Sequence, residues 1–233
     1  MIIGIALGTI HKSYLEHLTH LAHIKELVEL PMIQLAEHLA SEHGHVEKGS
    51  RETSHLASTL DWRGTGVLPP VRNQGDFGTC YAMATCYSIE CLILKVMGLK
   101  IQLSPQELID CGGFENIYNA YKYIMANGIG IECDLPYVGK KSSSCGVDKR
   151  KKRFYIDNYG YIPFKAHDES YLMEALYKQP ITVTLAVGED FGRYKRGVYD
   201  SYDRSSKNYH AMLLVGYGMF EGKKGVDSSK FIW

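Results

Sequence analysis

The chain has 233 residues, enough for one hydrophobic core or two small lobes, because single cores stop growing at about 250–300 residues. Its 26 basic and 26 acidic side chains balance, so no net charge draws it to nucleic acid or to a membrane surface. No apolar run reaches the roughly 20 residues that a membrane-spanning helix needs, and residues 1–10 lack the basic start and cleavage site of a signal peptide. We therefore expect a globular protein with no nucleic-acid partner and no membrane span.

The first 58 residues are predicted to form a helical segment and a polar linker. Leucine and isoleucine recur at helical spacing over residues 11–48, with a break at Pro31. Eight of the ten histidines lie before residue 56, and three of them, at positions 17, 20 and 23, share helical spacing. A histidine-rich metal-binding module is therefore kept as a remote hypothesis, but the spacing matches no structural metal site, and neither a metal nor a cofactor is predicted.

Three helices are predicted next, at Cys80–Met97, from Ser104 onward, and at Phe114–Ala126. The first is apolar on most faces, which predicts burial, and Gly98 provides its C-terminal cap. The second has Ser104 as N-cap, Pro105 at its first position, and Glu107 to complete a capping box.

Short strands are predicted from Phe154 onward, at residues 154–161, 181–187 and 211–217. Helices followed by strands predict an α+β fold with two lobes and a cleft between them. Between the two halves, the basic run Lys149–Arg153 is interpreted as an exposed loop and not as a nucleic-acid patch.

A cysteine, a glutamine and a histidine form a candidate acyl-transfer set. Cys80 begins the first helix, Gln74 precedes it by six residues, and His210 stands at the head of the last apolar strand. A helix N-terminus and a neighbouring imidazolium both lower the pKa of a thiol, which makes it a nucleophile. Taken singly, each residue has a simpler explanation as a buried thiol, a core histidine or a turn glutamine. Only the combination indicates catalysis.

The order and spacing of this set resemble the papain-like (cathepsin-type) cysteine proteases over about residues 60–233. The matching motifs are Asp61-Trp62-Arg63, Val71-Arg72-Asn73-Gln74-Gly75, Leu103 to Cys111, Gly112-Gly113-Phe114, Tyr209-His210-Ala211 and Val215-Gly216-Tyr217-Gly218. The resemblance implies the family's two-lobe fold in a peptidase domain over residues 59–233, after a prosegment-like region over 1–58. The helical lobe would span about residues 66–160 and the antiparallel, β-barrel-like lobe about 161–233.

The resemblance also implies the roles of individual residues. Cys80 would attack the scissile carbonyl, His210 would exchange the proton, and Gln74 would donate to the oxyanion together with the Cys80 N–H. The implied substrate-binding residues are Gly112, Gly113 and Phe114 along the channel, and Thr184, Asn208 and Ala211 in the pocket for the residue two before the cleavage point.

The remaining cysteines are interpreted through the same resemblance. It implies a disulfide between Cys111 and Cys145, and hence an oxidising compartment that is lysosome-like, vacuolar or extracellular. Cys86 and Cys91 are expected to be buried free thiols, and Cys133 has no evident partner. The implied partners are polypeptide substrates and cystatin-type inhibitors, and the implied state is a monomer.

Several positions depart from the family pattern. Phe77 replaces a cysteine of a family disulfide, Thr79 a smaller residue, and Tyr209 an asparagine or aspartate. The family's asparagine after the histidine, in an Asn-Ser-Trp-Gly motif, has no counterpart after His210; residues 230–233 resemble the strand that leads into that motif. The sequence thus predicts a chain cut short before the motif, with an incomplete β lobe. Two hypotheses follow: a cysteine endopeptidase made as a precursor, or a catalytically impaired paralogue or fragment that binds peptides or partners without cleaving them.

Overall fold

The computed structural model describes residues 56–113, 115–160, 170–195, 199, 208–220, 223–225 and 231–232. The helices are α4 (Cys80–Met97), α5 (Pro105–Cys111), α6 (Ile117–Asn127), α7 (Ser170–Lys178) and the short 3-10 helix η2 (Phe191–Arg193). The strands are β1 (Leu60–Asp61), β2 (Ile181–Ala186), β3 (Tyr209–Leu214), β4 (Gly216–Phe220), β5 (Lys223–Gly225) and β6 (Phe231–Ile232). Predictions for residues 11–48, for the side chain of Phe114 and for the end of the chain lie outside the described residues.

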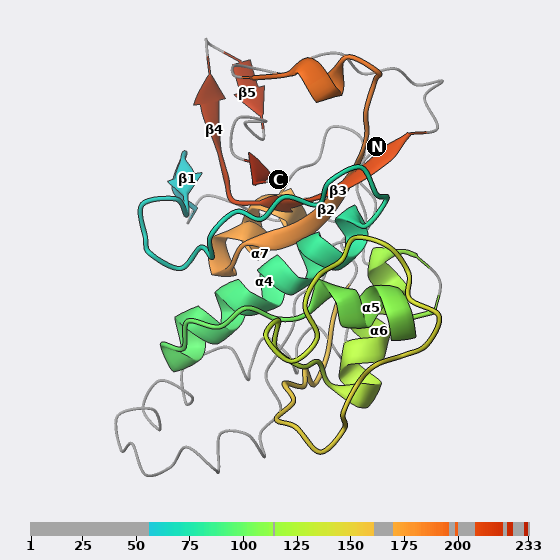
Figure 1. Ribbon diagram of the computed structural model, residues 1–233. Coiled ribbons are helices and arrows are strands. Elements are labelled where there is room, and N and C mark those ends of the chain that lie inside the picture. The colour runs from blue at the N-terminus through green and yellow to red at the C-terminus, as the bar shows by residue number, and fades with distance from the viewer. Residues whose placement is uncertain are drawn as a thin grey trace, which may run out of the picture.

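Helix α4 is the central element of the molecule. Figure 1 shows it crossing between the β2–β3 pair on one side and α5 and α6 on the other. Its bounds match the prediction, and Gly98 ends it in the left-handed conformation (φ 65°) with its N–H donating to the Leu94 carbonyl. Among the described helices α4 is also the one long and apolar enough to span a membrane, but most of its residues are buried inside the protein.

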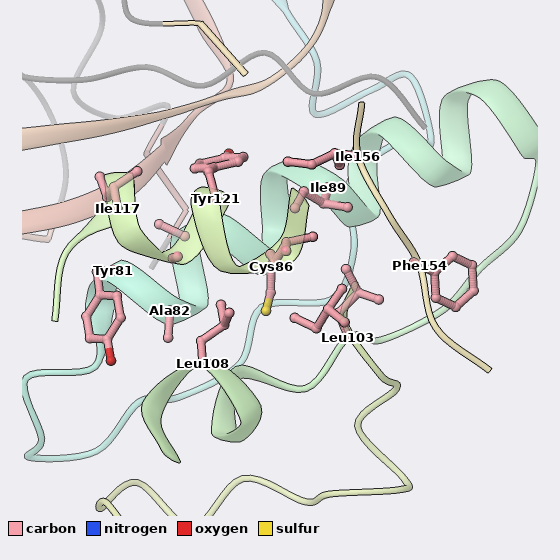
Figure 2. Packing of buried hydrophobic residues seen from close by; sticks show 14 of the residues in the cluster. Tyr81, Ala82, Cys86, Ile89, Leu103, Leu108, Ile117, Tyr121, Phe154 and Ile156 are labelled. Atoms are coloured by element: carbon pink, nitrogen blue, oxygen red, sulfur yellow. The ribbon is translucent and has the colours of Figure 1, made fainter. Parts of the chain in front are cut away.

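Two clusters of buried side chains lie on either side of α4. The helical core joins α4 to α5, α6 and residues 154–156, and Figure 2 shows Cys86, Leu103 and Tyr121 packed within it. The sheet core joins Met83, Tyr87 and Cys91 of α4 to Trp62, α7, β2 and β3. Each large apolar side chain that is fully buried contributes about 1.5–3 kcal/mol, so α4 is stabilised from both sides.

The described strands form two antiparallel sheets, in the orders β1-β4-β5 and β2-β3-β6. A single strand predicted over residues 211–217 is wrong, since β3 ends at Leu214 and β4 begins at Gly216 in the other sheet. The chain changes sheets at Val215, whose carbonyl accepts the Trp62 N–H at 2.8 Å. This contact connects the start of the globular part to its last strands.

The helix starts confirm part of the predicted capping. The Ser104 hydroxyl accepts the Glu107 N–H at 3.2 Å, but the Ser104 N–H donates to Gly130 and not to Glu107. The capping box is therefore only half formed, because the Glu107 carboxylate binds Arg153, the Tyr123 hydroxyl and the Gly130 N–H. The third helix starts at Ile117 and not at residue 114, because the Asn116 side chain accepts the Asn119 N–H and caps it there.

The segment after residue 149 differs from its predictions. Over residues 154–160 the structure contains isolated bridge residues at Phe154, which pairs with Ile129, and at Ile156, in place of the predicted strand. The basic run is an exposed loop only in part: the Arg150 side chain is 90% exposed, whereas that of Arg153 is 7% exposed and ion-paired with Glu107. Spacing in the sequence cannot distinguish the one buried arginine of a basic run, because its partner lies 46 residues away.

The disulfide between Cys111 and Cys145 is present, as the family resemblance implied. It closes a separation of 34 residues, for which the loss of chain entropy in the unfolded state predicts about 3–4 kcal/mol of stabilisation. Cys86 and Cys91 are buried free thiols, as expected, and Cys133 is an exposed one. Burial raises the pKa of the Cys86 and Cys91 thiols, so both are inert neutral groups.

Candidate active site

Cys80 is the first residue of α4. Its thiol is free and half-buried, and it packs against the helical core. Thr79 is the N-cap by position, but its side chain makes no capping bond and instead contacts the Tyr137 hydroxyl. Cys80 therefore lies at the positive end of the dipole of an 18-residue helix.

Strand β2 runs along α4 toward Cys80. The Ser88 hydroxyl donates to the Pro180 carbonyl at 3.3 Å, and the Thr182 hydroxyl donates to the Ala84 carbonyl at 3.1 Å. Two residues of a strand span about 6.6 Å, and four residues of a helix span about 6 Å. Contacts between β2 and α4 can therefore recur every two strand residues and every four helix residues. From one further step of this spacing, we infer that Thr184, near the outer end of β2, lies beside the first turn of α4.

His210 lies on β3 where that strand pairs with the last residues of β2. Thr184 pairs with Ala211, and Leu185 pairs with His210. Ala211 is buried in the helical core, the cluster against which Cys80 packs. Ala211, the residue after His210, thus belongs to the same cluster of side chains as Cys80.

The His210 imidazole is half-buried. Its ring centroid lies 5.8 Å from that of Phe191, with the two planes tilted by 56°. Burial lowers its pKa below the ordinary value, because removal of water disfavours the imidazolium. The neutral imidazole is the form that can accept a proton from a thiol.

The lowered pKa of His210 predicts a pH effect on stability. The unfolded chain binds a proton at His210 more readily, so the native state loses stability as the pH falls below about 6.5 and through the lower native pKa. We expect wild type to lose more unfolding free energy than His210→Gln between pH 7 and pH 4. Urea unfolding of both proteins across that range measures the difference. A constant difference between the two proteins would contradict the prediction.

Gln74 lies in the loop before α4. Its side-chain Nε2 donates to the Phe77 carbonyl at 2.8 Å, and the backbone carbonyl of Gln74 accepts the Tyr137 hydroxyl at 2.7 Å. A carboxamide carries two N–H groups, so this local bond uses one of the two donors of Gln74.

The glycine pair follows α5 directly. A Cβ on Gly112 would lie 2.4 Å from the Leu108 carbonyl oxygen, and Gly113 has φ 82°, so both positions require glycine. Phe114 lies outside the described residues. Asn208 is exposed, and its carbonyl accepts the Val187 N–H at 2.9 Å.

Two further points concern metal ligands and residues near the candidate site that the sequence did not predict. No group of three or more His, Cys, Asp or Glu in the described part of the chain could hold a metal ion. Tyr137 and Phe191 contact the candidate set but were not predicted. Each belongs to a loop or short turn with no pattern of its own, so only the tertiary contacts reveal it.

Comparison with known proteins agrees with this geometry. The papain family of cysteine proteases matches residues 56–227. Mexicain from Jacaratia mexicana is 36% identical over 169 residues, which are 69% of this chain and 77% of mexicain. Chain and family share the fold and the order of motifs, so the protein belongs to the papain family of cysteine proteases, which are thiol-dependent hydrolases.

Solved structures confirm the papain-like α+β fold. A cysteine protease from ragweed pollen, described in its proform, superposes with a TM-score of 0.66 at 27% identity, covering 82% of this chain and 62% of that one. Bromelain from Ananas comosus, solved in complex with the E64 inhibitor, gives 0.65 at 28% identity and covers 76% and 88%.

Proposed function

We propose that the chain is a cysteine endopeptidase that acts through an acyl-enzyme. The Cys80 thiolate attacks the scissile carbonyl carbon, forming a tetrahedral oxyanion. As that intermediate collapses, the C–N bond breaks and the amine leaves with a proton from His210. His210, now neutral, takes a proton from water, which attacks the thioester and releases the acid and the free thiolate.

The observation that carries this proposal is the register of β2 along α4 and of β3 along β2. Thr182 bonds Ala84, Thr184 pairs with Ala211, and His210 is the next residue of β3. This register supports a thiol and an imidazole within reach of one substrate carbonyl.

Two donors are proposed for the oxyanion. Cys80 is the first residue of α4, where a backbone N–H has no partner within the helix. The second donor is the remaining N–H of the Gln74 carboxamide. Donors of this kind contribute roughly 3–4 kcal/mol each to the transition state when they are held in place.

Substrate binding is proposed along both sides of this site. Gly112 and Gly113 leave the backbone after α5 open to an extended peptide, with Phe114 beside them. Thr184, Asn208 and Ala211 are proposed to form the pocket for the residue two before the cleavage point. Thr184 and Ala211 support this role, since they pair directly across β2 and β3.

The cellular setting is proposed from the disulfide and the family. A bridge such as Cys111–Cys145 persists in oxidising compartments, which favours a lysosome-like, vacuolar or extracellular location. We further propose that residues 1–58 act as a prosegment. Polypeptides are the proposed substrates, cystatin-type proteins the proposed inhibitors, and a monomer the proposed working state.

Labelling with an electrophilic peptidyl epoxide at pH 5.5, read by mass spectrometry, tests the proposed nucleophile. We expect rapid adduct formation at Cys80 and none in Cys80→Ala. The exposed thiol of Cys133 is an internal control, because it is accessible but lies outside the candidate site. Equal rates at the two thiols would overturn the proposal and favour a homologue that binds peptides without cleaving them.

A further inference from the structure

The Tyr137 hydroxyl joins both ends of the loop that precedes α4. It donates to the Gln74 carbonyl at 2.7 Å and is bonded to the Thr79 hydroxyl. A phenol has a single proton, which goes to Gln74, so the Thr79 hydroxyl is the donor in the second bond. One side chain thereby holds the backbone of the proposed oxyanion donor and the residue before the proposed nucleophile.

The loop between these two ends is closed by its own hydrogen bonds. Gln74 Nε2 and the Thr79 N–H both donate to the Phe77 carbonyl at 2.8 Å. Gly75 adopts φ 67°, and its N–H donates to the Asn73 side chain. A shift of Phe77 would therefore move the Gln74 amide and the start of α4 together.

Tyr137 itself is held firmly. Its N–H donates to the Glu132 carboxylate at 2.8 Å, and its ring packs against both the helical core and the sheet core. The next residues are fixed to α5 through Gln106, which accepts the Val138 N–H at 2.9 Å and donates to the Lys140 carbonyl at 2.8 Å. The segment that carries Tyr137 is therefore bound to α5, the helix that ends at the glycine pair.

A close approach between the two loops adds a second contact. A Cβ on Gly139 would lie 2.6 Å from the Phe77 ring, and Gly139 has φ 80°. Only glycine combines this conformation with this contact. The ring of Phe77 is thus seated on the same segment that carries Tyr137.

We propose that Tyr137 is a positioning residue for the oxyanion site, acting through Gln74 and Thr79. The inference rests on the function proposed above, because it assigns a purpose to the fixed position of the Gln74 amide. Without the hydroxyl, the loop from Gln74 to Thr79 keeps its internal bonds and the contact between Phe77 and Gly139, but it loses both hydrogen bonds to Tyr137.

Tyr137→Phe separates this role from a general loss of structure. We expect kcat for a peptide substrate to fall about 10- to 100-fold, with KM changed by less than about twofold. Alkylation of Cys80 by iodoacetamide should keep its wild-type rate, since displacement of iodide forms no oxyanion. Tyr123→Phe is the matched control, because it removes another half-buried hydroxyl, bonded to Glu107, and should leave kcat unchanged.

Coupling to Gln74 gives the decisive comparison. Gln74→Ala keeps the carbonyl that Tyr137 binds but removes the carboxamide, so adding Tyr137→Phe should lower kcat no further. Full additivity of the two losses would overturn the proposal, and so would wild-type kcat in Tyr137→Phe alone.

Hydrogen exchange supplies a readout that does not depend on activity. We expect Tyr137→Phe, but not Tyr123→Phe, to speed amide exchange across residues 75–80 by about tenfold or more. Absence of hydrolysis by wild type would count against the proposed function, and exchange would still decide the role of Tyr137. Unchanged amide exchange in Tyr137→Phe would overturn the proposed positioning role, whether or not wild type hydrolyses peptides.

Discussion

Replacement of Cys80 by alanine should abolish peptide hydrolysis, with kcat/KM falling by at least about 10⁴-fold. Without the thiolate no acyl-enzyme can form. The buried thiols at positions 86 and 91 cannot replace Cys80 as the nucleophile, because their raised pKa values keep them protonated. Initial rates with a fluorogenic peptide measure the effect. Cys133→Ala, which removes an exposed free thiol, is the control and should retain the wild-type rate.

His210 should act as one unit with Cys80. His210→Ala alone is expected to lose nearly as much activity, and the double variant little more than either single one, because the base has no role without the nucleophile. Independent, additive losses would show that the two side chains do not work on one carbonyl. Activity retained in Cys80→Ala would place the nucleophile elsewhere.

Replacement of Arg153 by methionine should lower the free energy of unfolding by about 3–5 kcal/mol. The substitution leaves the Glu107 carboxylate, 2% exposed, as a buried charge without its cation. It also removes the donors that satisfy the Asn127 and Gly128 carbonyls at the end of α6. Urea unfolding monitored by tryptophan fluorescence measures the loss.

Two further variants show whether the buried charge is the cause. Arg150→Met in the same basic run removes an exposed arginine and should leave the unfolding midpoint unchanged. Glu107→Leu combined with Arg153→Met should recover much of the lost stability, because no unpaired charge remains. A double variant less stable than Arg153→Met would contradict this explanation.

The helix bounds show how far local signals reach. Cys80–Met97 was predicted to the residue, because an apolar run and a following glycine act on neighbouring backbone alone. Local sequence patterns gave a wrong prediction where a side chain bonds a partner that is distant in the sequence. Glu107 satisfies the capping-box pattern, but its carboxylate pairs with Arg153.

The strands depended more on the rest of the molecule. The apolar run at 211–217 cannot show that the chain changes sheets at Val215, since the Trp62 N–H that pairs with this residue is remote in the sequence. The same holds for the bridge at Phe154, because its partner, Ile129, is also remote in the sequence.

For the candidate site, the residue types and their order were legible in the sequence, because a thiol, an imidazole and a carboxamide imply one chemistry at recognisable spacing. That chemistry identified Cys80, His210 and Gln74 as candidates before any contact was known. Tertiary structure adds the register of β2 along α4 and of β3 along β2, from which we propose that His210 lies near Cys80. Only the fold reveals Tyr137, because its bonds to the Gln74 carbonyl and the Thr79 hydroxyl, about 60 residues away, leave no periodic pattern in the sequence.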